Sequence, residues 1–95
     1  MLLLPYNETI QDLFEQYLQE IRGYANLSTT QLGELIGVSR QTINNMEAGR
    51  TPINKCTCIA LSAIFEGLAE RDTMLRLRIE KLLYENYGPA WIETL

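Results

Sequence analysis

The chain has 95 residues, of which 46% are apolar and 21% charged. These values fit a small globular protein, and they exclude wholesale disorder and a large catalytic cleft beside the core. The net charge of −4 predicts only modest non-specific affinity for any polyanion, because that affinity comes from neutralising its charges.

The N-terminal segment Met1–Tyr6 is apolar, but it lacks a basic region and is too short for a signal sequence or a membrane span. We therefore expect a cytoplasmic protein that does not bind membranes. The first helix should then run from about Glu8 to Tyr24, ending near Gly23 and Asn26. Its apolar residues recur at three- and four-residue spacing, which predicts a buried stripe made of Ile10, Leu13, Phe14, Tyr17, Leu18 and Ile21.

A second, short helix should begin after Ser28 and end at Ile36. Ser28 and Gln31 have the spacing of a capping box, in which each side chain bonds the other residue's backbone amide. Gly37 is suited to the left-handed residue that ends a helix. A third helix should start at Ser39 and run to about Glu47 or Ala48.

Two more helices are expected in the second half of the chain. The fourth should span about Asn54 to Phe65, with Gly67 ending or bending it, and it should bury Ile59, Ala60, Ala63 and Ile64. The last should run from about Arg71 to Tyr87, before Gly88. Its apolar stripe comprises Leu75, Ile79, Leu82 and Leu83.

The residue types that usually carry catalysis are scarce. The chain has no histidine, and its two cysteines, Cys56 and Cys58, would point to different sides of a helix. No phosphate-binding glycine loop or nucleophile motif is present. We therefore expect no enzyme activity, no metal and no cofactor.

Residues 28–50 form the segment that indicates function. Two short helices joined through Gly37 should cross steeply, as in a helix-turn-helix. Leu32, Leu35, Val38 and Ile43 are expected to face inward, with Gly33 at the closest approach of the two helices. The outward face of the third helix is crowded with hydrogen-bonding groups from Arg40, Gln41, Thr42, Asn44 and Asn45. Such side chains can bond base edges in the major groove of DNA.

The run LSTTQLGELIGVSRQTINNMEAGRTP, from Leu27 to Pro52, closely resembles the Cro/CI type of helix-turn-helix domain, also called the xenobiotic response element family. The resemblance covers about Glu15 to Phe65. It implies an all-α, lambda-repressor-like bundle of five helices that forms a homodimer on a palindromic operator in double-stranded DNA. A transcriptional regulator, most simply a repressor, is the function that follows.

The resemblance also assigns roles to individual positions. It makes Arg40, Gln41 and Asn45 the principal base readers, with Thr42 and Asn44 contacting a base or a phosphate. The positions that it places along the phosphate backbone are Thr29, Ser39, Arg50, Thr51 and Lys55. Thr29 is shorter than the glutamine that the family usually has there, and Gly33 replaces a more usual alanine.

A structural ion pair is implied as well. The family often joins a basic residue late in the first helix to the glutamate before the glycine that follows the third helix. Those positions are Arg22 and Glu47 here. Their pairing would fix the first helix against the third.

Charge is unevenly distributed along the chain. Residues 28–55 carry three basic and two acidic side chains, and they are the one segment with a positive balance. Sequence-specific base contacts and dimerisation would have to supply most of the affinity for DNA.

The whole chain, residues 1–95, is expected to be one domain, with the C-terminal helix and tail from about residue 68 to 95 as a possible dimerisation element. Apolar residues at both ends could form the dimer interface or fold over the domain itself; they are Met1–Leu4, Tyr84, Tyr87, Trp91 and Ile92. The basic residues Arg71, Arg76, Arg78 and Lys81 alternate with acids and are expected to form a solvated face.

Two other functions stay open at this point. One is an antitoxin-like module that binds a protein partner with or without its own operator. The other is a domain of the same fold that serves protein contacts alone.

Overall fold

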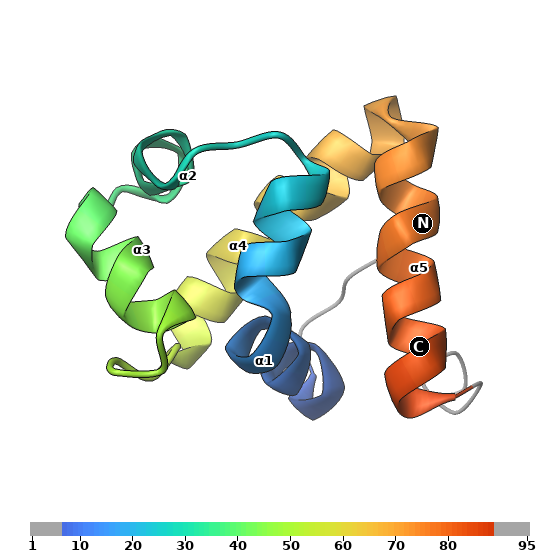
Figure 1. Cartoon of the computed structure of the whole chain (residues 1–95), viewed down its shortest axis with the longest axis horizontal. Coiled ribbons are helices and arrows are strands. Elements are labelled where there is room, and N and C mark those ends of the chain that lie inside the picture. Colours follow the sequence, from blue (N-terminus) through green and yellow to red (C-terminus); the bar gives the residue numbers. More distant parts are fainter. Residues whose placement is uncertain (1–6, 89–95) are drawn as a thin grey trace.

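The computed structural model describes residues 7–88 (Figure 1). Within that range it contains five helices and no strand, so the expectation of an all-α, five-helix bundle is confirmed. The helices are α1 (Glu8–Tyr24), α2 (Thr29–Ile36), α3 (Arg40–Glu47), α4 (Lys55–Arg71) and α5 (Thr73–Tyr87). The apolar ends Met1–Leu4, Trp91 and Ile92 lie outside the described residues.

The helices surround one core (Figure 1). α1 and α4 lie in the middle, α2 and α3 pack together on one side of them, and α5 packs on the other side against α1 and α4. Phe14 from α1 and Phe65 from α4 are fully buried and stack with ring centroids 5.8 Å apart. No helix in residues 7–88 is long and apolar enough to cross a membrane.

Every helix starts with a side-chain cap. The residue that precedes the helix accepts a hydrogen bond from the backbone amide three positions later, which satisfies one of the free amides of the first turn. The capping residues are Asn7, Ser28, Ser39, Asn54 and Asp72. The capping box of Ser28 and Gln31 is complete. The predicted start of α2 is therefore confirmed, and Ser39 caps α3 instead of forming its first residue.

α4 differs from the prediction in length and in orientation. It continues through Gly67 to Arg71, and the chain then turns at the extended residue Asp72, which caps α5. Arg71 therefore belongs to α4 and not to the last helix. The prediction of which side of α4 is buried is also wrong. The buried residues of α4 are Cys58, Leu61, Ser62, Phe65 and Ala69. Ile59 is 46% exposed and Ala63 is exposed as well.

The interior of the α2–α3 unit is smaller than expected. Leu32 and Ile43 are fully buried and Val38 is partly buried, but Leu35 is 49% exposed. Leu35 faces a shallow hollow of about 260 Å³ beside α4 and not the core.

Gly33 makes the close approach that was predicted, although its neighbour is the turn and not the body of α3. The Val38 amide donates to the Gly33 carbonyl at 2.8 Å. A Cβ atom on Gly33 would lie 2.6 Å from the Val38 carbonyl oxygen, which is closer than such atoms approach in proteins. The lack of a side chain therefore lets the turn close tightly.

Gly33→Ala should consequently destabilise the fold. Alanine adds about 1 kcal/mol of helix propensity, but the backbone displacement costs about 1–3 kcal/mol. We expect a net loss of about 1 kcal/mol in the free energy of unfolding, measured by urea titration. Gly23→Ala is the matched control, because a Cβ there would meet no atom within 4 Å. A Gly33→Ala protein as stable as the Gly23→Ala protein would contradict the tight approach.

Polar contacts dock α5 onto α1. The Tyr17 hydroxyl donates to Asn86 Oδ1 at 2.7 Å, and the Tyr87 hydroxyl donates to Asp12. Burial, together with this carboxylate, raises the pKa of Tyr87. Tyr87 is thus engaged within the chain itself, while Tyr84 stays 59% exposed. The basic residues of α5 are exposed, as expected, and two of them pair along the helix with Glu80 and Glu85.

Candidate functional site

α3 presents a polar face away from the core. Ile43 and Met46 are buried and anchor the helix, so the residues between and before them point outward. Arg40 and Gln41 are exposed, and the three remaining polar residues are partly exposed; these are Thr42, Asn44 and Asn45. α3 lies on the side of the molecule far from α5, so α5 does not cover this face (Figure 1).

The turn before α3 fixes the crossing of α2 and α3. Gly37 has φ +79°, a left-handed conformation that glycine adopts without steric cost. Ser39 then caps α3 through its hydroxyl, which lies 3.0 Å from the hydroxyl of Thr42. Ser39 and Thr42 are therefore brought together at the N-terminus of α3, where backbone amides without helical partners favour anions.

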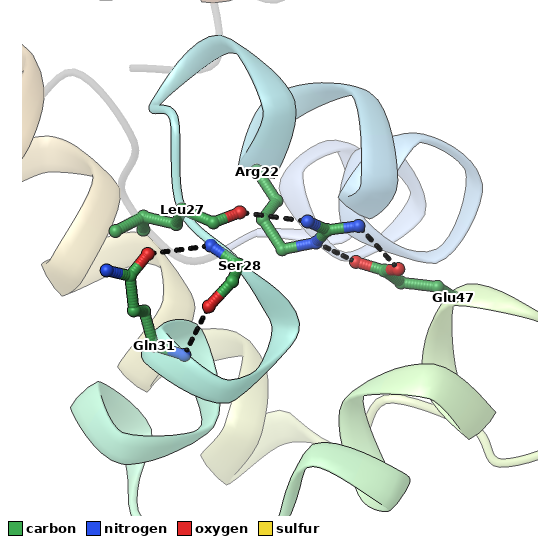
Figure 2. Close-up of polar contacts among 5 residues, drawn as sticks. All are labelled: Arg22, Leu27, Ser28, Gln31 and Glu47. Carbon is green, nitrogen blue, oxygen red and sulfur yellow. Dashed lines mark hydrogen bonds and ion pairs between the residues drawn. The ribbon is translucent and has the colours of Figure 1, made fainter.

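The structure contains the ion pair expected between Arg22 and Glu47. Arg22 Nε lies 2.6 Å from Glu47 Oε2, and Arg22 Nη2 donates to Glu47 Oε1 at 3.1 Å, so the contact is bidentate (Figure 2). The side chains are only 16% and 8% exposed. α1 is therefore bound to the C-terminal end of α3 by a charge pair that is largely shielded from water.

Arg22 also reaches the segment before α2. Its Nη1 donates to the Leu27 carbonyl at 2.8 Å, and the next residue is Ser28 of the capping box (Figure 2). One guanidinium thus ties together the end of α1, the start of α2 and the end of α3. This places the two helices of the motif relative to the body of the protein.

Of the five side chains expected along a phosphate backbone, three directly flank α3 in the chain. Ser39 precedes α3, and Arg50 and Thr51 follow it in the loop to α4. Thr29 is the first residue of α2 and is partly buried, while Lys55 is the exposed first residue of α4.

Two hydrogen bonds to Asn45 were not predicted from the sequence. Asn45 Oδ1 accepts hydrogen bonds from Gln41 Nε2 at 3.3 Å and from Arg50 Nη1 at 3.2 Å. The four-residue spacing of Gln41 and Asn45 is a signal for a side-chain pair on a helix. The contribution of Arg50 depends on the path of the loop and has no such signal.

Comparisons with known proteins agree with this geometry. The model of a family described as helix-turn-helix domain matches residues 16–63, just over half of the chain. A protein of Thermococcus kodakarensis named as an HTH-type transcriptional regulatory protein is 36% identical over 66 residues, and one of Pyrococcus furiosus with the same type of name is 35% identical over 66 residues. Each match covers 68% of this chain and 21% of the relative, so the chain spans about a fifth of these relatives' length. No solved structure gives a significant match.

Proposed function

Since the chain belongs to the helix-turn-helix domain family, of the Cro/CI type, we propose that it regulates transcription by binding a specific sequence in double-stranded DNA. The observation that carries the proposal is the outward face of α3. It offers one cationic and four uncharged polar side chains, and the core lies on the opposite side. Base edges in the major groove are recognised by this set of donors and acceptors.

The family geometry extends the proposal to a homodimer on a palindromic operator that represses by occupying the site. Two α3 helices would then enter successive major grooves about 34 Å apart. Arg40 and Gln41 are the principal readers, since they are exposed at the N-terminal part of α3. Thr29, Ser39, Arg50, Thr51 and Lys55 would contact the backbone.

Selection of duplexes from a random pool, at one fixed and low salt concentration, tests the proposal. The expected result is enrichment of a sequence with twofold symmetry. A pool from which no sequence is enriched would contradict it.

Arg40→Ala and Gln41→Ala should each lose discrimination at one base pair of each half-site, by about 1–3 kcal/mol. The loss follows because each side chain supplies a bidentate contact that alanine cannot make. Competition binding with single-base variants of the enriched sequence measures it. Arg71→Ala and Gln16→Ala are matched controls, because both residues are exposed and lie outside the helix-turn-helix, on α4 and α1. Wild-type discrimination in both test variants would place the recognition face elsewhere.

An antitoxin-like or other protein-binding module is the second candidate. The observation that favours it is the exposed Leu35, which lines a shallow hollow together with Ala63, Ile64, Gly67 and Leu68. Under this alternative, Leu35→Lys should abolish a stable complex with a protein partner and leave any duplex binding unchanged. Light scattering after co-expression measures the complex.

A further inference from the structure

Asn45 joins the recognition face of α3 to the loop that follows it. Its backbone carbonyl accepts hydrogen bonds from the amides of Arg50, at 2.9 Å, and Thr51, at 3.3 Å. Its side-chain oxygen accepts from Arg50 Nη1 and from Gln41 Nε2. A single residue therefore holds one proposed base reader and one proposed phosphate contact.

Arg50 determines which way the side-chain carboxamides of Asn45 and Gln41 are turned. Arginine can only donate hydrogen bonds, so the Asn45 atom that faces it must be the carbonyl oxygen. The same oxygen can accept only from the amino group of Gln41. Gln41 is therefore left with its carbonyl oxygen and one N–H for an outside partner. These two groups match the amino group and the N7 acceptor of adenine.

The same contacts leave Asn45 poorly equipped to read a base. A bidentate contact to adenine needs both the oxygen and the amino group of a carboxamide. The Asn45 oxygen already accepts two hydrogen bonds, and Asn45 as a residue is less exposed than Gln41.

Building on the proposed function, we propose that Asn45 is a positioning residue: it orients the Gln41 carboxamide toward an adenine and holds Arg50 toward the phosphate backbone. This changes the role expected for Asn45 from the sequence, where it stood among the base readers. It also couples the reading of one base pair to a backbone contact at the other end of α3.

Two substitutions of Asn45 separate positioning from reading. Asn45→Ala removes the shared acceptor. Asn45→Asp keeps an acceptor for Gln41 and Arg50 but has no donor, so a base reader would lose half of its contact. Gln16→Ala is the matched control, because it removes an exposed carboxamide that also bonds a residue four positions away, Asp12, but lies on α1 outside the recognition face.

The readout is base preference at every position of the enriched duplex, with thermal melting to establish folding. Asn45→Ala should lose about tenfold in preference at the base pair that Gln41→Ala affects. Asn45→Asp should keep the ranking of bases at that pair, although its negative charge weakens binding to every duplex. In Asn45→Ala the slope of log affinity against log salt should also fall by about one, as in Arg50→Ala.

Two results would overturn the inference while leaving the proposed function intact. One is a loss of preference in Asn45→Ala at a base pair that Gln41→Ala does not affect, which would make Asn45 a reader. The other is an Asn45→Asp protein that loses base ranking as fully as Asn45→Ala. If the unsubstituted chain enriches no duplex at all, the proposed function fails first, and this inference fails with it.

Discussion

Glu47→Ala should lower the free energy of unfolding by about 3–5 kcal/mol, because it leaves the Arg22 guanidinium largely buried without its partner. After the substitution, the Arg22 guanidinium stays shielded from water. It keeps its hydrogen bond to the Leu27 carbonyl, which compensates only part of the lost interaction. Chemical denaturation followed by circular dichroism measures the change.

Two controls distinguish the loss of the Arg22–Glu47 ion pair from the general effect of removing a carboxylate. Glu34→Ala removes an exposed glutamate from α2 and should change stability by about 0.5 kcal/mol or less. The double substitution Arg22→Met with Glu47→Leu should be less destabilising than Glu47→Ala, because no unpaired charge remains buried. If Glu47→Ala has the same free energy of unfolding as Glu34→Ala, the contact contributes nothing to stability.

The pair also bears on function, since it lies at the C-terminal end of α3. Glu47 is the last residue of that helix, two positions beyond Asn45. Weakening the pair would free the end of α3 from α1. The orientation of α3 is therefore set in part by a contact at its C-terminal end.

The parts of the fold that sequence predicts well are those that local rules govern. Ser28 with Gln31, and Gly37 after Ile36, place the ends of α2 through contacts within a few residues. The same holds for Ser39 before α3. These signals depend on backbone amides and dihedral angles that no distant segment has to complete.

The orientation of α4 could not be predicted in this way. Between Lys55 and Glu66 the helix has no charged residue, and apolar residues occur on all sides of it. Periodicity consequently does not select a face. Packing against α1, α2 and α5 selects it, and both α1 and α2 are distant from α4 in sequence. Gly67 does not end α4, because a glycine within a helix costs only about 1 kcal/mol, which packing on either side of it offsets.

The candidate site likewise has features that the sequence predicts and features that it does not. The outward position of Gln41 follows from the buried Ile43 and Met46 on the same helix. The bond from Arg50 to Asn45 depends on how the loop returns past the end of α3. Sequence therefore predicts which side chains face outward, while the contacts among them need the structure.

Phe65→Ala should destabilise the protein by about 3–5 kcal/mol, because it removes a fully buried ring that stacks on Phe14 at the centre of the bundle. The cavity would lie between α1 and α4, the two central helices, where neighbouring side chains can collapse into it only partly. Urea titration at fixed temperature measures the loss.

Ile59→Ala is the companion measurement, since Ile59 lies on the same helix but is 46% exposed. It should cost about 1 kcal/mol or less, because much of its side chain already contacts water. Positions 59 and 65 point in directions about 120° apart around a helix, so both cannot face the centre of one core. A larger loss in Ile59→Ala than in Phe65→Ala would mean that α4 is rotated, with the face predicted from sequence turned inward after all.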